Sequence, residues 1–183
     1  MDKSRHTPRL DLIPLSKPQL KWTLDSPESL EQSLGVKFDT AIIDENVIRA
    51  IGMKLAKMAT LPSEQHIWQT YWLIIERDAQ TGIGLAGFKS PPDDQGLSEV
   101  GYGIAPAWHN RGYMSEALHG LLDWAFEQPD CLGITATAVQ NPASRRLLEK
   151  LGATLVEEDE NESSWVFHKV RASHPKDEKR SGK

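Results

Sequence analysis

The segment that most constrains the fold is residues 99–117, EVGYGIAPAWHNRGYMSEA, where a strand-like stretch passes through a glycine turn directly into an amphipathic helix. The first N–H groups of a helix lack partners within it, and the aligned peptide dipoles place about half a positive charge at that end. Gly112 lets the backbone approach a ligand closely. Side-chain donors stand in the same turn at His109, Asn110 and Arg111. The turn therefore predicts an anion site, although an ordinary strand-to-helix turn can carry the same residues.

A second strand-to-helix unit follows Pro129. Residues 134–139 alternate as a strand does, Asn141 is placed to cap a helix, and Pro142 takes the favoured first helical position. Leucines then recur at helical spacing until Gly152 ends the helix. Because open sheets bind small molecules at the ends of their strands, the two units together predict a ligand in the cleft between them.

In this order of elements the chain resembles the GCN5-related N-acetyltransferases (GNAT), and among them the branch that acetylates the amino termini of ribosomal proteins. The resemblance is carried by HNRGYM at residues 109–114, by NPAS at 141–144 and by Leu151-Gly152. It covers roughly residues 9–170 in layout. The fold that it implies is α/β (α+β), with a mixed, mostly antiparallel, splayed sheet of about six to seven strands flanked by about four helices.

The resemblance also implies acetyl-coenzyme A as the donor and assigns residues to its binding. The expected contacts are the main chain of Tyr102, Gly103, Ile104 and Ala105 for the pantetheine arm, the turn His109, Asn110, Arg111, Gly112, Tyr113 and Met114 for the pyrophosphate, and further contacts from Asn141 and Ser144. The family's pyrophosphate loop usually begins with Arg or Gln and ends with Gly or Ala, so His109 and Met114 depart from it. Because backbone makes most of the phosphate contacts, His109 weakens only the cationic one.

Two residues are candidates for the chemistry. Glu99 lies on the strand before the turn, where relatives use a glutamate. We therefore expect it to take the amine proton through a water. The alternative is that Glu99 is an exposed strand residue without a role. Ser144 corresponds to the serine near the coenzyme sulfur in the ribosomal-protein branch; it is expected to hydrogen-bond or pass a proton to the departing thiolate, unless it only begins a helix. Other members carry a base where this chain has Ala136 and a tyrosine where it has Leu148, so that version of the mechanism is absent.

The acceptor is expected to be a primary amine. An α-amine, with a pKa of about 7.8, is neutral at pH 7 far more often than a lysine amine with a pKa of about 10.4, so it needs a weaker base. A peptide amino terminus therefore comes first, and a polyamine or antibiotic amine second. Residues 157–162 form an acidic run, which either binds a cationic substrate or is simply solvated. Two other interpretations stay open: a regulatory domain that binds acyl-coenzyme A without turnover, and a pure interaction domain.

Composition limits the classes of partner. The net charge of −5 argues against a nucleic-acid-binding protein, which needs a basic face. The chain has no apolar run of about 18 residues, so no membrane partner is predicted. A single cysteine, Cys131, favours a reducing, cytoplasmic location. His66 has no partner at metal-ligand spacing, so no metal is predicted, and both a monomer and a homodimer remain open.

At 183 residues the chain can bury one core, and we expect a single domain over residues 9–170 between a flexible start, 1–8, and a disordered tail, 171–183. Further expected elements are a strand from Leu10 to Leu15, a helix from Pro27, a helix capped by Asp44, strands at 70–76 and 84–89, and a hairpin of 154–157 with 164–170. Residues 82–87 match the letters of the dinucleotide motif G-x-G-x-x-G, but two prolines follow where that motif needs a helix. No Rossmann site is therefore predicted.

Overall fold

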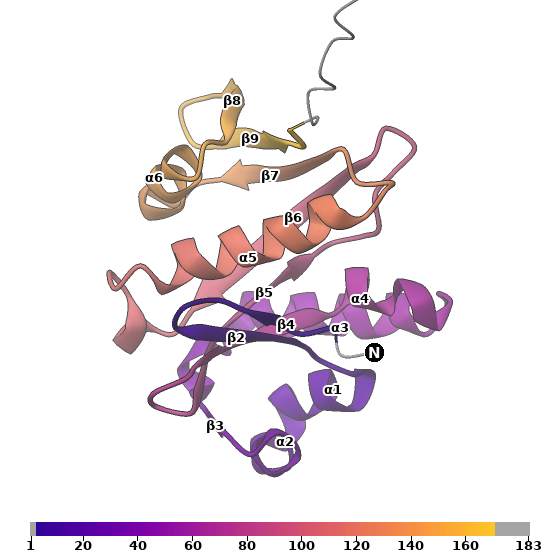
Figure 1. Ribbon diagram of the computed structural model, residues 1–183, viewed down its shortest axis with the longest axis vertical. Helices are drawn as coiled ribbons and strands as arrows, with labels where there is room; N and C mark the ends of the chain where they lie inside the picture. The colour runs from indigo at the N-terminus through magenta and orange to yellow at the C-terminus, as the bar shows by residue number, and fades with distance from the viewer. Residues whose placement is uncertain (1–2, 171–183) are drawn as a thin grey trace, which may run out of the picture.

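A computed structural model describes residues 3–170 of this protein (Figure 1). The predicted tail, 171–183, lies outside the described residues, as do the first two residues of the predicted flexible start. The strands are β1 (Arg5–His6), β2 (Leu10–Pro14), β3 (Lys37–Phe38), β4 (Tyr71–Glu76), β5 (Thr81–Phe88), β6 (Leu97–Ile104), β7 (Gly133–Val139), β8 (Thr154–Glu158) and β9 (Ser163–His168). The helices are α1 (Lys17–Asp25), α2 (Pro27–Leu34), α3 (Glu45–Met58), α4 (His66–Gln69), α5 (Tyr113–Glu127) and α6 (Pro142–Lys150). Among residues 3–170, no helix has both the length and the apolar character needed to cross a lipid bilayer.

The strands form one sheet in the order β1-β2-β4-β5-β6-β7-β9-β8, with β3 beside β5. Neighbours are antiparallel except for two parallel pairs, β3 with β5 and β6 with β7, so the predicted mixed, mostly antiparallel sheet is confirmed. The numbers of elements were underestimated, since the described residues form nine strands and six helices. The helix α1, with 9 residues, was not predicted. The other additional elements are short: β1 and β3 have 2 residues each and α4 has 4. Segments of that length are too short for a periodic apolar pattern to reveal them.

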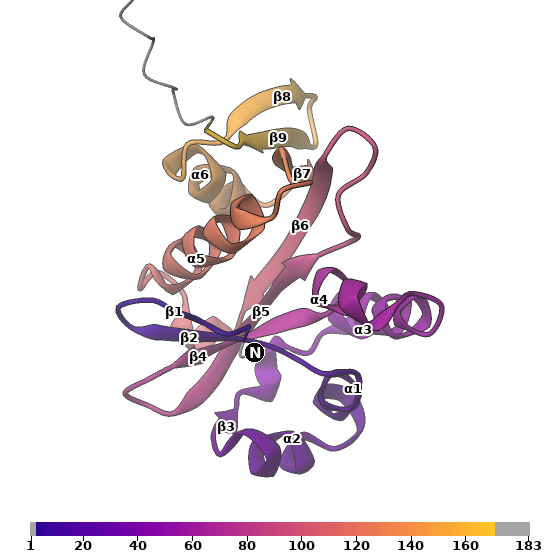
Figure 2. The ribbon, with the colours of Figure 1, turned by 45° about the vertical axis from the view of Figure 1, so that its right-hand side comes forward.

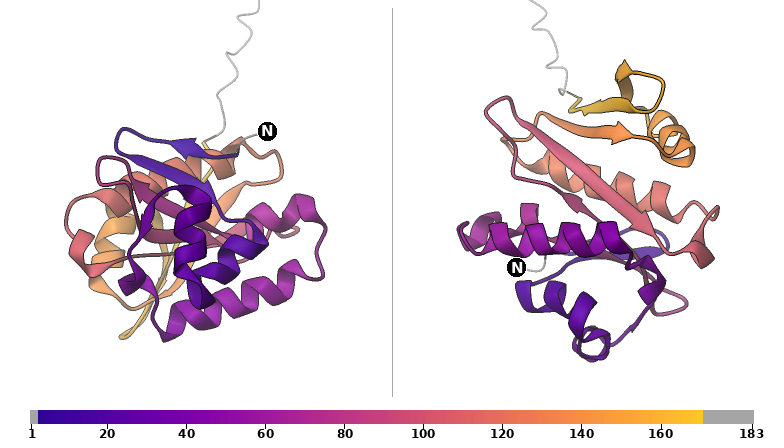
Figure 3. Two further views of the ribbon diagram at one scale, coloured as in Figure 1. Left: turned by 90° about the horizontal axis from the view of Figure 1, so that it is seen from below. Right: turned by 180° about the vertical axis from the view of Figure 1, so that it is seen from behind.

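Helices cover both faces of the sheet. Figure 1 shows α5 across the near face, and the right-hand view of Figure 3 shows α3 across the opposite one. The predicted strand at 70–76 forms β4 and is buried on both sides, because its side chains alternate between two cores. Trp72 and Ile74 belong to the core under α5, whereas Leu73 and Ile75 belong to the core under α1, α2 and α3.

The strands β6 and β7 pair only where they begin. Their ladder joins Leu97–Glu99 to Gly133–Thr135, although β6 continues to Ile104 and β7 to Val139. Beyond Glu99 the two strands separate toward their carboxyl ends, so the predicted splay is confirmed (Figures 1 and 3). Figure 2 shows β7, β9, β8 and α6 together at one end of the molecule, with α1 and α2 at the other.

The glycine-rich segment 82–87 lies inside β5, and the next regular element is β6 rather than a helix. The expectation that this segment is not a dinucleotide turn is therefore confirmed. The glycines instead permit close contact between strands: a Cβ atom at Gly84 would lie 2.7 Å from the main-chain oxygen of Gly103.

Candidate functional site

A cleft of about 390 Å³ lies where β6 separates from β7, between the first turns of α5 and α6. This volume is in the range of small-molecule sites. The predicted coenzyme-binding residues in its wall are Tyr102, Gly103, Ile104, His109, Asn110, Gly112, Tyr113, Met114, Asn141 and Ser144. Trp108, Ser115, Ala143, Leu147 and Lys150 complete the lining. Thus the two strand-to-helix units that the sequence singled out do meet in one cleft, and their turns form its walls.

The amino terminus of α5 is open toward this cleft. Gly112 takes the N-cap position with a left-handed φ of 78°, and no side chain among the described residues caps this helix end. The first main-chain hydrogen bond of the helix runs from Glu116 N to Gly112 O at 3.1 Å. The N–H groups of residues 113–115 therefore precede the helical ladder and are available to an anion. By contrast, Asp44 caps α3 with its carboxylate, as predicted.

Side chains of the turn brace it against β6. His109 Nε2 lies 2.9 Å from the main-chain oxygen of Ile104, and the Arg111 guanidinium lies 5.4 Å from the centre of the Trp108 ring. The Ala105 N–H donates to Ile83 O at 2.9 Å and is thereby engaged within the sheet. Ala105 and Arg111 stand beside the cleft rather than in its wall, within the part of the chain that the structure describes.

Two cations that the sequence reasoning missed lie at this turn. Arg9 donates from Nη1 to Arg111 O at 3.0 Å, and its guanidinium carbon lies 4.4 Å from the centre of the Tyr113 ring. Lys150, at the end of α6, lines the cleft. No signal in the sequence links Arg9 to Gly112, because the two are brought together only by the N-terminal hairpin. Arg9 also forms an ion pair with Glu116, whereas Lys150 forms none among the described residues, so Lys150 supplies positive charge that His109 does not.

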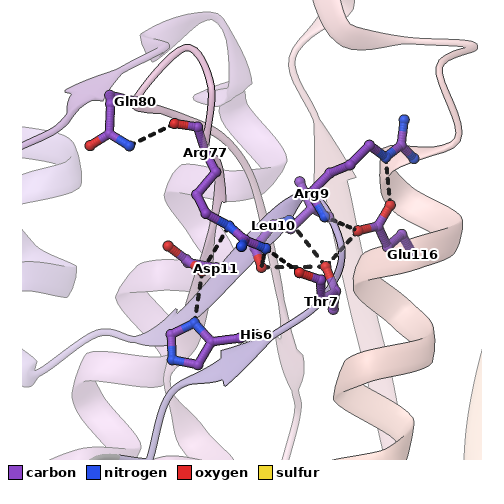
Figure 4. Close-up of polar contacts among 8 residues, drawn as sticks. All are labelled: His6, Thr7, Arg9, Leu10, Asp11, Arg77, Gln80 and Glu116. Atoms are coloured by element: carbon purple, nitrogen blue, oxygen red, sulfur yellow. Dashed lines mark hydrogen bonds and ion pairs between the residues drawn. The ribbon is translucent and has the colours of Figure 1, made fainter.

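Two carboxylates of α5 tie the N-terminal hairpin to that helix: Glu127 pairs with Arg5 of β1, and Glu116 makes the larger set of contacts (Figure 4). Glu116 accepts hydrogen bonds from Thr7 Oγ1 at 2.6 Å, from Arg9 N at 2.8 Å and from Arg9 Nε at 2.7 Å. Residues Arg5–His6 pair with β2 as β1, so the predicted flexible segment 1–8 is ordered over its described part. Burial alone would raise the pKa of Glu116, but the bonds from Thr7 and Arg9 and the charge of Arg9 hold it below the ordinary value.

This tie predicts a dependence of stability on acid. Because the folded pKa of Glu116 lies below its ordinary value of 4.5, the contact stabilises the fold above that pH, and the stabilisation is lost as pH falls through the lowered pKa. Glu116→Gln should therefore flatten the fall in unfolding free energy between about pH 5 and pH 3. Urea unfolding at several pH values measures this. The exposed Glu28→Gln variant is the control, and parallel curves for Glu116→Gln and the native chain would contradict the assignment.

A second hollow, of about 630 Å³, lies on the other side of the turn. Gly112, Ser115 and Lys150 line both it and the cleft, so the two adjoin at the end of α5. The rest of its lining includes Arg5 and Arg9, which pair with Glu127 and Glu116 of the same lining.

Glu99 lies where β6 and β7 part, and its side chain is 24% exposed. Its Oε1 atom is 2.5 Å from Lys89 Nζ and 2.5 Å from Thr137 Oγ1. The carboxylate thus bridges β6 to β7 at the apex of the splay. Both contacts use Oε1, so Oε2 is the oxygen that we expect to receive a proton.

Ser144 is paired with a residue that the sequence reasoning had assigned only a main-chain role. Burial raises the pKa of the Tyr102 phenol, and a hydrogen bond with Ser144 partly offsets that rise. Both side chains line the cleft. Asn141 Oδ1 accepts from Ala143 N at 2.8 Å and so caps α6, as predicted. Since Tyr102 and Ser144 come from separate elements, only the folded arrangement shows that they form a pair.

The predicted acidic run is partly a structural turn. Asp159 accepts main-chain hydrogen bonds from Asn161 and Glu162, which lower its pKa and hold the turn between β8 and β9. Glu158 pairs with Arg145 of α6 at 2.8 Å. These contacts favour the interpretation that the acidic run is a solvated structural turn, rather than a surface that binds a cationic substrate.

Comparison with known proteins assigns the fold to a family. The model of the acetyltransferase (GNAT) domain family matches residues 20–154, which is most of the chain. The chain belongs to the GNAT acetyltransferase family. The uncharacterized N-acetyltransferase YjdG of Bacillus subtilis (strain 168) is 31% identical over 97 residues; that match covers 52% of this chain and 58% of YjdG. The match therefore spans little more than half the length of this GNAT relative.

Solved structures show the same GNAT fold. The ribosomal-protein-S5-alanine acetyltransferase of Vibrio fischeri superposes with a TM-score of 0.63 at 15% identity, covering 92% of this chain and 97% of its own. The ribosomal L7/L12 alpha-N-protein acetyltransferase RimL in complex with coenzyme A gives 0.59 at 14% identity, covering 91% and 98%. At these identities the likeness establishes the fold. The predicted GNAT fold is confirmed, and members of the ribosomal-protein branch are among its structural neighbours.

Proposed function

We propose that this chain transfers an acetyl group from acetyl-coenzyme A to a primary amine, with the α-amine of a peptide as the first candidate. The observation that carries the proposal is the uncapped amino terminus of α5 facing a cleft of small-molecule size at the splay. Backbone N–H groups at such a helix end suit the coenzyme's diphosphate. Membership of the GNAT family supports the choice of acyl donor, because these enzymes use acetyl-coenzyme A.

In this proposal each part of the coenzyme has its own set of contacting residues. The N–H groups of residues 113–115 hold the diphosphate, with Arg9 and Lys150 supplying positive charge. The main chain of β6 from Tyr102 to Ile104 is proposed to pair with the pantetheine arm, since β7 has diverged from that edge. The hollow beyond Gly112 then receives the nucleotide end.

Acetyl transfer removes a proton from the attacking amine and leaves a thiolate that can accept one. Two groups of residues are proposed for these two roles. Glu99 Oε2 takes a proton from the attacking amine, through a water, while Lys89 and Thr137 hold Oε1 in place. The Tyr102–Ser144 pair donates a hydrogen bond or a proton to the departing thiolate. A thiol with a pKa of about 8.5 needs no strong acid, so hydroxyl groups suffice.

Thiol release from acetyl-coenzyme A tests this proposal when it is measured against a panel of short peptides, polyamines and aminoglycosides. We expect turnover with peptides that have a free amino terminus and none with the same peptides after amino-terminal blocking. Turnover only with polyamines or aminoglycosides would favour the small-molecule alternative. Coenzyme A binding without turnover for every amine would favour a regulatory acyl-coenzyme A-binding domain, and absence of binding would favour an interaction domain.

A further inference from the structure

A separate cavity of about 230 Å³ lies on the α3 side of the sheet, away from the α5 cleft. Its walls come from α3, α4, β4, β5 and β6, and they include the charged or polar side chains of Lys54, Lys57, Gln69 and Lys89. The right-hand view of Figure 3 shows α3 lying over this face of the sheet. The coenzyme assignment uses none of these residues, so the cavity requires its own explanation.

Two paired glycines line the floor of the cavity, and one of them, Gly101, leaves open space above it. Gly87 of β5 and Gly101 of β6 are direct partners across the ladder, and Tyr71 of β4 pairs with Gly87 on the other side. A Cβ atom built at Gly101 would meet no atom within 4 Å. The floor of the cavity is therefore bare backbone, which leaves space for a ligand group.

Lysine side chains supply the positive charge of the cavity. Lys54 is 6% exposed; its Nζ donates to Phe88 O at 2.5 Å and lies 4.5 Å from the centre of the Tyr71 ring. Lys57 Nζ donates to Lys89 O at 3.1 Å. Burial, and then the charges of Lys57 and Lys89, lower the pKa of Lys54 to about 7. Within residues 3–170, Glu99 is the carboxylate that forms an ion pair in this group, through Lys89. Near pH 7 the lowered pKa leaves Lys54 only partly protonated, and a carboxylate in the cavity would favour its charged form while also facing Lys57.

A buried polar atom at the same cavity lacks a partner. Gln69 is 2% exposed, and its Oε1 accepts no hydrogen bond within the described residues. A buried carbonyl oxygen without a donor costs free energy, so it marks a place where a ligand N–H would be favourable. A ligand that satisfies both features carries a carboxylate for the lysines and an N–H for Gln69.

The cavity adjoins the proposed base. Lys89 lines the cavity and contacts Glu99, and Gly101 lies two residues further along the same face of β6. Two residues of a strand span roughly 7 Å, about the distance from a peptide's amino terminus to the side chain of its second or third residue. An amine held at Glu99 can therefore place a nearby side chain in the cavity.

We propose that this cavity is a subsite for an acidic side chain of the acceptor, so that the preferred substrate is a peptide with Asp or Glu close to its free amino terminus. The carboxylate meets Lys54 and Lys57, and a main-chain N–H of the peptide donates to Gln69 Oε1. This inference rests on the proposed acetyl transfer for the identity of the ligand, but the subsite itself does not require turnover.

The test compares two amidated peptides, Ala-Asp-Ala and Ala-Asn-Ala, which differ only in charge. Their binding to protein saturated with unacetylated coenzyme A is measured by calorimetry, and their acetylation by thiol release. We expect the Asp peptide to bind about 10-fold more tightly. Lys54→Met should abolish that preference and leave binding of the Asn peptide unchanged. Gly101→Val, which fills the cavity without altering charge, should also abolish it. The exposed Lys37→Met is the matched control and should retain the preference.

The outcomes separate the two proposals. Equal binding of both peptides, or a preference that survives both Lys54→Met and Gly101→Val, overturns the acidic subsite even if both peptides are acetylated. A preference that both variants remove, without acetylation of either peptide, supports the subsite and contradicts acetyl transfer to these amines.

Discussion

Replacing Gly112 by valine is expected to weaken coenzyme A binding by about 100-fold, because the change acts on the helix end that we propose to hold the diphosphate. The φ of 78° at Gly112 is a conformation that a β-branched residue adopts only with strain of about 1–3 kcal/mol. A Cβ there would also stand 3.5 Å from Arg9 Nη2, at the point where backbone must approach the ligand. Calorimetric titration of coenzyme A into the variant measures the loss.

A matched control separates strain from binding. Gly35 follows α2 with a φ of 70°, and a Cβ there would meet nothing within 4 Å. Gly35→Val should therefore lower the free energy of unfolding by a similar amount, yet bind coenzyme A normally. If both variants bound coenzyme A as the native chain does, the turn at Gly112 would not be the diphosphate site.

Glu99→Gln is expected to lower the rate of acetyl transfer by about 100-fold or more while leaving coenzyme A affinity unchanged. Glutamine keeps the shape of the side chain and can still accept from Lys89 and Thr137 through its amide oxygen. Its amide nitrogen replaces Oε2 and cannot take the amine proton, so the loss should appear in kcat and not in coenzyme binding. Thiol-release kinetics with a peptide acceptor, beside coenzyme A titration, separate the two quantities.

Two further variants sharpen this result. Glu28→Gln changes an exposed glutamate of α2 and should leave kcat unaltered. Thr137→Val removes one of the two contacts to Oε1 without touching the carboxylate, and we expect a smaller loss than for Glu99→Gln. A full rate in Glu99→Gln would show that the amine loses its proton to water or to another group.

Local signals in the sequence were sufficient to predict several of the helices and strands. The Asp44 cap, the Asn141-Pro142 helix start and the buried strand at 70–76 each depend on neighbouring residues, and each was predicted. The apolar spacing of residues 47–58 predicts that Ile48 lies on the buried face of α3 with Ile51 and Met58, but Ile48 is 48% exposed. Lys54 is buried in its place, because a lysine stem can pack while its ammonium finds an acceptor.

Contacts between distant segments could not be predicted. Arg9 and Glu116 are 107 residues apart, and nothing in the hairpin sequence indicates that it ties down α5. The Tyr102–Ser144 pair and the lysine cavity likewise depend on how separate elements pack. A resemblance carried by short turns therefore predicted the cleft that we propose for the coenzyme, but gave no information on the opposite side of the sheet.

The most direct test of the central claim, that the open end of α5 binds a diphosphate, is a pair of calorimetric titrations with coenzyme A and with pantetheine, which lacks the diphosphate and nucleotide. We expect coenzyme A to bind, and pantetheine to bind about 100-fold more weakly or worse. Equal affinity for the two compounds, or no affinity for coenzyme A, would contradict that claim.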